Sequence, residues 1–427
     1  MKLLIKNGRV LNPANGFDGT ADVLVCDGVI KKVEKDIESS DAKVIDATGL
    51  FVMPGFIDLH THMRDPGQTH KETVETCAEA AAAGGYTLIV GMPNTSPVVD
   101  NVETLSYVLN KGASCGIKVC QVGSITMGMN GEELSDLPAM KKAGAIAFSE
   151  DGKSVMSAGL CRNAMQKLKE LDMPFLDHCE DNSISPGGVF NDDTDAAKFG
   201  VKLIPNITEN AIAFRDILIA KDTGARLHLC HCSTKEIAGL LMKLQKEGGF
   251  ENITAEICPH HFSMTSADIK DGESLTNYKM NPPLRTKEDV DALKAALKTG
   301  AIGVISTDHA PHSFEEKQKP LASAPFGITG LETAAALTFT HLVKEGVLTP
   351  LQMAERMSFN PAKVIKVPYG TLNEGAAADI VLFDPDKEYV IDKKDFKSKS
   401  FNTPFIGEKV TGMVVKTISG GKVVFER

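Results

Sequence analysis

The stretch PGFIDLHTH, residues 54–62, decides the fold of this 427-residue chain. It is an apolar run that ends in two histidines, His60 and His62. Side chains two positions apart on an extended strand face the same side, so both imidazoles can face one site, and Arg64 continues that parity. Two unrelated polar residues at the mouth of a strand are the alternative. A buried strand that ends in His-x-His indicates a metal site at its carboxyl end.

Apolar strands and helices alternate through the middle of the chain. The expected strands span 51–59, 86–92, 117–122, 144–149, 173–178, 226–231, 252–258 and 302–307. The expected helices span 72–83, 101–111, 132–142, 157–170, 206–222, 234–247, 286–298 and 328–345. Eight such units predict an α/β fold of the (β/α)8 TIM barrel type. A doubly wound open sheet would give the same alternation, but no glycine-rich phosphate-binding sequence opens the first helix.

Both ends of the chain differ from this middle part. They contain short apolar runs separated by turn sequences such as Asn7-Gly8, Asp27-Gly28 and Gly420-Gly421, which is the pattern of β-hairpins. We therefore expect a small β-sandwich domain formed from both termini. Its two parts are residues 1–52 and 366–427, and the barrel, a metal-dependent catalytic domain, spans 53–365.

Composition excludes several classes of function. The formal charge of −10, from 46 basic and 56 acidic residues, argues against nucleic-acid binding. No stretch reaches the roughly 18 apolar residues of a membrane span, and the first residues lack the apolar core of a signal peptide. Nine cysteines without a CxxC pair are typical of a reducing compartment. We expect a cytoplasmic protein with no nucleic-acid or membrane partner.

Six of the eleven histidines lie at or just past the end of an expected strand. Catalytic groups of a (β/α)8 barrel gather at the carboxyl ends of its strands. Six histidines at the ends of four strands are therefore hard to explain as separate structural residues. The six are His60, His62, His178, His231, His309 and His312.

Several motifs resemble those of one protein family. PGFIDLHTH resembles the metal signature of the amidohydrolase superfamily, whose barrels bind one or two metals. Blocks similar to those of its type I dihydroorotases occur in order: GMPNT (91–95), NPPLR (281–285), TDHAPH (307–312) and APFGI (324–328). The sequences NPA (360–362) and ADI (378–380) resemble the superfamily's C-terminal junction. The whole chain is thus similar to type I dihydroorotase.

The resemblance implies two zinc ions per chain, held by six side chains. The implied ligands are His60, His62, Asp151, His178, His231 and Asp308. Asp151 would be shared by both ions, and Asp308 would also be the catalytic group that carries the proton. Glu150 is the rival for the shared position, and a carboxylated Lys153 is a further alternative, displaced by two residues.

Neighbours of the implied ligands are expected to be structural. His231 can face inward only if Cys230 and Cys232 face the helical layer, so we expect both cysteines in the core. His309 is expected to be a structural neighbour of Asp308.

The resemblance also implies a set of substrate-binding residues: His62, Arg64, Asn94, Asn281, His312, Phe326 and Gly327. Arg64 offers a planar fork that suits a carboxylate, and the alternative is an ordinary surface ion pair. The loop 310–327 carries three of these residues. It is expected to be either a mobile lid over the site or a solvated surface loop.

The implied reaction is the reversible cyclisation of N-carbamoyl-L-aspartate to L-dihydroorotate, with release of water, in pyrimidine biosynthesis. A homodimer and an association with aspartate transcarbamoylase are the expected macromolecular partnerships. Two alternatives stay open. A related cyclic amidase, such as a hydantoinase or allantoinase, would usually carry the modified lysine where this chain has Asp151. A non-catalytic scaffold similar to dihydroorotase would typically have lost metal ligands.

Overall fold

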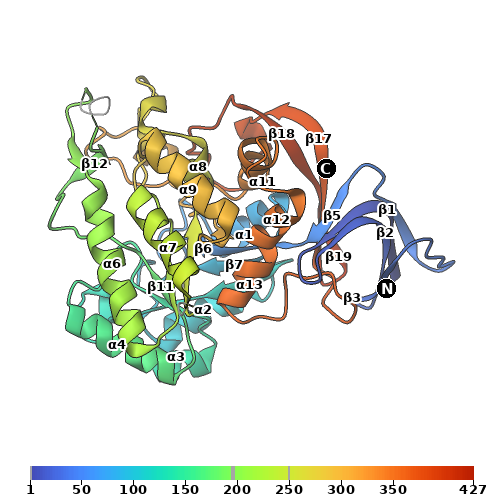
Figure 1. Ribbon diagram of the computed structural model, residues 1–427, viewed down its shortest axis with the longest axis horizontal. Helices are drawn as coiled ribbons and strands as arrows, with labels where there is room; N and C mark the ends of the chain where they lie inside the picture. Colours follow the sequence, from blue (N-terminus) through green and yellow to red (C-terminus); the bar gives the residue numbers. More distant parts are fainter. Residues whose placement is uncertain (1, 194–197, 249–250) are drawn as a thin grey trace.

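The computed structural model describes residues 2–193, 198–248 and 251–427. Figure 1 shows two parts of the molecule, namely parallel strands covered by helices and a β-rich unit that holds both chain ends. Among the described residues, none of the helices combines the length and the apolar character that crossing a membrane requires.

Parallel strands succeed one another in chain order through the larger part. One sheet contains β6 (Phe56–Thr61), β7 (Tyr86–Gly91) and β8 (Lys118–Gln121). A second contains β9 (Gly123–Ser124), β10 (Phe148–Ser149), β11 (Phe175–Asp177), β14 (Leu227–Leu229), β15 (Ile253–Ile257) and β16 (Val304–Ile305). Only Val122 separates β8 from β9. At the other end, Thr61 pairs in parallel with His309, just past β16.

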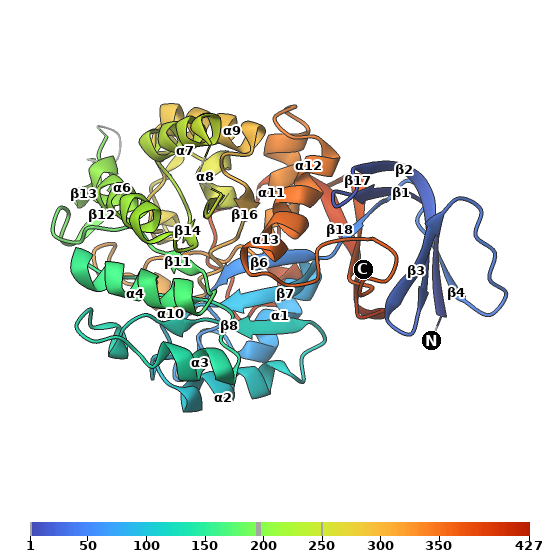
Figure 2. The same ribbon diagram turned by 60° about the horizontal axis from the view of Figure 1, so that its bottom comes forward.

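Helices come after the strands and lie outside them, as Figure 2 shows for α2, α3, α4, α6, α7 and α9. The longer helices are α1 (Val74–Ala83), α2 (Val102–Gly112), α3 (Leu137–Ala143), α4 (Ala158–Glu170), α6 (Asn206–Thr223), α7 (Lys235–Glu247) and α9 (Lys287–Thr299). Most begin where a Ser, Thr, Asn or Asp side chain accepts a hydrogen bond from a first-turn amide, as Thr286 does from Asp289 in α9. The expected boundaries agree with these helices within two residues, except that α3 begins at Leu137 rather than at the expected residue 132.

Shorter helical segments complete the chain. They are α8 (Pro259–Ser263), α10 (Phe314–Lys317), α11 (Ala334–Thr338), α12 (Pro350–Ala354) and α13 (Asn360–Val364). The 3-10 turns are η1 (Met127–Met129), η2 (Ser266–Asp268), η3 (Leu275–Tyr278) and η6 (Lys393–Asp395), and the π-helical turns are η4 (Phe339–Val343) and η5 (Glu355–Phe359). The helix expected from residue 328 begins only at Ala334, because Ile328 pairs with His309 and the Thr329 amide bonds the Asn402 carbonyl.

Strands from both termini form one β-rich unit, as expected. They are β1 (Lys2–Asn12), β2 (Phe17–Cys26), β3 (Val29–Glu34), β4 (Lys43–Asp46), β5 (Phe51–Pro54), β17 (Ile380–Val390), β18 (Lys409–Ser419) and β19 (Lys422–Glu426). A separate pair, β12 (Gly188–Asn191) and β13 (Lys202–Ile204), lies on the larger part.

The β-rich unit is one branched sheet rather than the expected sandwich of two. Its order is β19-β18-β17-β5-β1-β2-β3, and β4 also pairs with β1. The branch arises because β1 changes partner at an irregularity between Ile5 and Gly8, with β4 before it and β5 after it. A bridge from Val29 to Ala377 brings the β3 edge back to β17, so the sheet curls around a shared apolar core.

A single glycine joins the two parts. Gly55 separates β5 from β6, and its amide bonds the Asp379 carbonyl at 2.9 Å. A Cβ at this position would lie 2.3 Å from the side chain of Thr87 on β7. The close approach of these strands therefore requires glycine, and it fixes the direction in which β6 carries its histidines.

A buried ion pair stabilises the loops above the strands. Arg285 is 2% exposed, and its guanidinium lies 3.2 Å from Glu209 Oε2. The same guanidinium bonds Ser233 Oγ at 3.0 Å and Asn191 Oδ1 at 3.0 Å. These bonds hold the segment after Asn281 against β12, α6 and the loop after β14.

Arg285→Met should cost about 3–5 kcal/mol in the free energy of unfolding, because it leaves the Glu209 carboxylate buried without its partner. Lys287→Met is the matched control, since the Lys287–Asp291 pair is 2.7 Å apart but its side chains are 76% and 58% exposed. It should cost at most about 1 kcal/mol. Denaturant titration measures both, and equal losses would contradict a structural role for the buried pair.

Candidate metal centre and substrate site

Four imidazoles and two carboxylates converge at the carboxyl ends of the parallel strands. Asp151 Oδ1 lies 3.2 Å from His60 Nε2, 3.2 Å from His178 Nδ1 and 3.4 Å from His231 Nε2. Asp308 Oδ1 lies 3.0 Å from His62 Nε2 and 3.6 Å from His60 Nε2. All six side chains are buried. The structure therefore brings together every ligand that the sequence predicted.

The donor set suits a divalent cation. Ligand atoms of His60, His62 and Asp151 lie within 4.8 Å of one another, and so do those of Asp151, His178 and His231. Asp151 belongs to both groups. The His60 Nε2 atom is buried and has no hydrogen-bond partner, so it can bind an ion once it has released its proton. Imidazole and carboxylate are ligands that zinc prefers.

The two rivals of Asp151 point elsewhere. The Glu150 carboxylate accepts hydrogen bonds from the backbone amide of Thr126, at 3.0 Å, and from its hydroxyl. Lys153 Nζ donates to the Met129 carbonyl at 2.8 Å. Of the three candidates, only Asp151 lies within the histidine cluster.

Both carboxylates of the cluster are ionised at neutral pH. Burial alone would raise the pKa of Asp151, but the charge of His60 and hydrogen bonds from two other imidazoles hold it well below its usual range. Burial would also raise the pKa of Asp308, yet its hydrogen bond with His62 and the charge of His60 lower it. The centre therefore offers two negative charges to a cation.

One imidazole holds its proton tightly. Burial lowers the pKa of His178, but hydrogen bonds with Asp151 and Glu180 outweigh this effect and raise it to about 10. A metal binds neutral imidazole, so an ion that enters this group has to displace the proton.

Three of the four imidazoles are held from behind by a polar side chain. The pairs of ring nitrogen and oxygen are His60–Glu256 (2.9 Å), His62–Asn94 (2.9 Å) and His178–Glu180 (3.1 Å). A ring nitrogen that is fixed in this way leaves the opposite nitrogen directed into the centre. Asn94, predicted as a substrate residue, thus also orients a predicted ligand.

Glu256 is an anchor that sequence reasoning missed. It is fully buried on β15, and its two oxygens lie 2.9 Å from His60 Nδ1 and 3.0 Å from His228 Nε2. The available signal was a lone acid inside the apolar strand Ile253–Ile257, because a buried carboxylate needs partners.

The prediction that Cys230 lies in the core was right, but the predicted direction toward the helical layer was wrong. Cys232 packs in the apolar cluster between the strands and the helices. Cys230 packs instead in the cluster on the inner face of the strands, within ligand distance of His60 and Glu256. Strand alternation does not apply here, because His231 lies past the end of β14 and has a φ of 33°. That backbone turn brings His231 into the centre beside Cys230.

His309 lies in a structural network, as expected. Its Nε2 atom is 3.4 Å from Glu72 Oε2, and its Nδ1 atom accepts a hydrogen bond of 3.2 Å from the Gly330 amide. Its backbone carbonyl bonds the His62 amide at 2.8 Å. His309 therefore holds the ends of the first and eighth strands together.

Arg64 and His312 lie next to each other beside the cluster. Arg64 is 8% exposed; its Nε donates to the Pro311 carbonyl at 3.2 Å, and its Nη2 lies 3.2 Å from His312 Nε2. His312 Nε2 also lies 2.7 Å from the Phe326 carbonyl and donates to it, because a carbonyl can only accept. Burial lowers the pKa of Arg64 to about 10, which leaves it charged at neutral pH.

The remaining predicted substrate residues lie on two segments that contact each other. Asn281 donates from Nδ2 to Glu180 Oε2 at 2.8 Å, so it reaches the anchor of His178. Gly327 has a φ of 113°, and its amide bonds the Lys279 carbonyl at 2.9 Å. The loop 310–327 and the segment 279–281 are thus in direct contact.

The C-terminal segment supports the same loop. Asn402 donates from Nδ2 to the carbonyls of Ala310 and Gly327, both at 3.1 Å, and its Oδ1 accepts from the His312 amide at 3.0 Å. No sequence pattern indicated this contact between residues so far apart in the chain.

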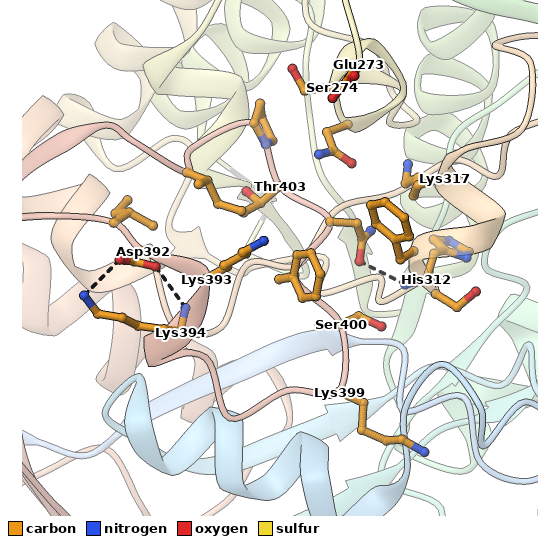
Figure 3. A pocket seen from close by; sticks show the side chains of 18 of the residues that line it. Glu273, Ser274, His312, Lys317, Asp392, Lys393, Lys394, Lys399, Ser400 and Thr403 are labelled. Carbon is orange, nitrogen blue, oxygen red and sulfur yellow. Dashed lines mark hydrogen bonds and ion pairs between the residues drawn. The ribbon is translucent and has the colours of Figure 1, made fainter.

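A cavity of about 1020 Å³ lies beside this support. Residues of α10, η3 and the segment 390–407 line it, and His312 and Lys317 lie on one side of it (Figure 3). It shares only the His312 side of the predicted substrate site.

Glu256→Gln should weaken metal binding about 10- to 100-fold, because the amide cannot accept from two imidazoles with both of its ends. Competition with a chelator measures the affinity. Glu150→Gln is the matched control, since Glu150 is an equally buried acid whose carboxylate bonds Thr126 rather than an imidazole. Equal weakening by both substitutions would contradict a specific role for Glu256.

Comparison with known proteins assigns the chain to a family. The family described as Dihydro-orotase-like matches residues 49–237. The "Dihydroorotase" of Pelotomaculum thermopropionicum is 45% identical over 426 residues, which cover 100% of this chain and 99% of that relative. The "Dihydroorotase" of Bacillus subtilis is 45% identical over 428 residues, with 100% and 99% covered.

A solved structure has a similar fold. The L-hydantoinase (dihydropyrimidinase) of Arthrobacter aurescens superposes with a TM-score of 0.86 at 27% identity, over 99% of this chain and 96% of that one. The fold shared with that protein and the histidine–carboxylate centre of this chain both agree with the full-length sequence similarity to dihydroorotases. This chain belongs to the dihydroorotase family, hydrolases of cyclic amides in the amidohydrolase superfamily.

Proposed function

We propose that this protein is a dihydroorotase that catalyses the reversible cyclisation of N-carbamoyl-L-aspartate to L-dihydroorotate, with release of water, in pyrimidine biosynthesis. The observation that carries the proposal is the shared Asp151 carboxylate within a cluster of four imidazoles, in a chain of this family. Arg64 beside the cluster suits the carboxylate of this substrate.

The centre is proposed to hold two zinc ions. One would take His60, His62, Asp151 and Asp308, and the other Asp151, His178 and His231. When bound, the ions would polarise a carbonyl oxygen and lower the pKa of a water molecule. The two ionised aspartates and the orphan His60 Nε2 support this assignment.

We infer that the parallel strands close into a (β/α)8 barrel that spans residues 53–365. Support comes from the chain order of the strands, from the single residue between β8 and β9, and from the Thr61–His309 bridge. In such a barrel the carboxyl ends of all strands face one site. Residues 1–52 and 366–427 would form the accessory β-rich domain.

Asp308 is proposed as the catalytic residue. In ring opening, its carboxylate takes a proton from the attacking water and passes it to the leaving ring nitrogen. Its low pKa keeps it ionised at neutral pH, which a group that accepts a proton requires. In cyclisation, the same group takes a proton from the carbamoyl nitrogen and delivers it to the departing oxygen.

The neighbouring residues are proposed to bind and orient the substrate. Arg64 would present its guanidinium fork to the α-carboxylate, and Asn94 and His312 would complete that contact. Asn281 and the backbone of Phe326 and Gly327 would hold the ring. His62 would serve both the metal and the substrate.

Two alternatives are less well supported. A hydantoinase-like activity is named by the similar solved structure, but such enzymes usually carry a carboxylated lysine, whereas here Asp151 takes that position and Lys153 bonds a carbonyl. A non-catalytic scaffold would not need all six ligand positions. Comparative turnover of dihydroorotate, hydantoin and allantoin separates the three.

Location and assembly are further proposals. All nine cysteines are free thiols, which suits the reducing cytoplasm. A homodimer and a complex with aspartate transcarbamoylase are expected, and sedimentation of the protein alone and in mixture measures both.

The protein should contain about two zinc ions per chain and turn over dihydroorotate faster than hydantoin or allantoin. Elemental analysis and activity are measured on one preparation. Asp151→Ala should lose both ions, because both share this ligand. At most one ion after zinc is added back, or full metal retention by Asp151→Ala, would contradict the shared-ligand centre.

Asp308→Asn should keep most of its metal while losing about 10²- to 10⁴-fold in rate, the usual contribution of a general base. The amide oxygen can still coordinate, but it cannot take the proton. Forward and reverse rates should fall together, because one group serves both directions. Near-normal turnover with metal bound would rule out the proton-transfer role.

A further inference from the structure

Two buried lysines connect the loops that carry the predicted substrate residues. Lys279 precedes Asn281 by two positions, and Lys317 lies at the end of α10, between His312 and Phe326. They are 2% and 3% exposed, respectively. Lysine is almost never this buried without a paired charge, so their contacts need an explanation.

Lys317 Nζ binds three backbone carbonyls on two different segments. It lies 3.0 Å from the Thr276 oxygen, 3.4 Å from the Lys279 oxygen and 3.0 Å from the Pro325 oxygen. In return, Thr276 Oγ1 donates to the Lys317 carbonyl at 2.5 Å. One ammonium group thus joins the segment before Asn281 to the residue before Phe326.

Lys279 makes the reciprocal connection. Its Nζ donates to the carbonyls of Leu321 and Ala322, at 2.8 and 3.2 Å, and lies 4.5 Å from the centre of the Phe326 ring. Each lysine therefore extends from one substrate-facing segment and binds the other. The loop has an exposed outer face, at Phe314 and Lys319 for example, but these contacts tie it down, so it is a fixed surface loop rather than a free lid.

Neither ammonium group has a counter-ion in the part of the chain that the structure describes. Within residues 2–193, 198–248 and 251–427, no carboxylate forms an ion pair with Lys279, Lys317 or Arg64. The nearby Glu316 pairs with Lys71 at 3.2 Å. Buried charges are costly unless they are paired, so an incoming anion would stabilise the charged forms of Lys279, Lys317 and Arg64.

The electrostatics agree with that geometry. Burial, together with the charges of Lys279 and Arg64, lowers the pKa of Lys317 to about 7. Burial also lowers the pKa of Lys279. A carboxylate that entered beside Arg64 would relieve this mutual repulsion.

We propose that Lys279 and Lys317 are positioning residues that hold the two substrate-facing segments together and supply the positive field that selects an anionic cyclic amide. The inference rests on the proposed dihydroorotase function. It assigns to a pair of residues outside the metal centre the preference for a carboxylated ring over a neutral one such as hydantoin.

The test compares Lys317→Met and Lys279→Met with Lys319→Met, which removes an exposed lysine from the same loop. The holoenzyme of each variant is assayed in both directions, and its metal content is measured. The first two variants should raise KM about 10- to 100-fold, the loss expected for hydrogen bonds to a charged group. Metal content should stay unchanged, and kcat should change less than KM. Lys319→Met should match the unaltered protein.

The two substrates separate the effect of a lost positive charge from the effect of lost positioning. N-carbamoyl-L-aspartate carries two carboxylates and dihydroorotate carries one, so a lost cation should raise KM more for the former. Lys317→Arg, which keeps the charge, should restore part of the loss. An equal rise of KM for both substrates would contradict the role of the field.

Unchanged KM in both methionine variants, with metal bound, would overturn the whole proposal. If Lys317→Met fails to fold, Lys279→Met and Lys317→Arg decide the outcome. Failure of the unaltered protein to turn over dihydroorotate would instead contradict the proposed function, which keeps the two tests distinct.

Discussion

The carboxylate of Asp151 is the constraint on which the rest of the site depends. One oxygen atom lies within 3.4 Å of nitrogen atoms from three imidazoles, which come from the ends of three different strands. In a dry interior, such a carboxylate is stable only while these partners remain in place. The carboxyl ends of these strands must therefore lie level with one another. The close approach of β6 and β7 at Gly55 helps to set the position of β6.

The loops around this centre are held by side chains that do not belong to it. Asn402 holds the loop 310–327 from the C-terminal segment, and the two lysines tie it to the segment before Asn281. The β-rich unit is thus more than an appendage, because the chain that returns to it supplies a support for the substrate site. Rigidity of this kind is what a binding site needs when small displacements reduce its affinity.

Local pattern in the sequence, together with the family resemblance, was enough to predict much of the fold and of the proposed site. The alternation of apolar runs predicted the strand and helix series. The resemblance to type I dihydroorotase implied the six proposed metal ligands and their neighbours Arg64 and His312. The features that the sequence did not reveal depend on contacts across the fold. Glu256 reaches His60 from the seventh strand, and His231 reaches the centre beside the inward-facing Cys230 because the backbone at His231 leaves the strand conformation. The curled single sheet likewise depends on a change of partner along β1, which alternation cannot reveal.

The burial of charge links these points. The imidazoles around the Asp151 carboxylate stabilise it, whereas backbone carbonyls alone hold the two buried lysines among the described residues. The proposed metal centre offers negative charge, and the loops beside it offer positive charge, although the chain as a whole carries a formal charge of −10. Because field strength inside a protein depends on nearby buried groups far more than on distant exposed ones, an acidic protein can bind cations at one group of side chains and an anion at the group beside it.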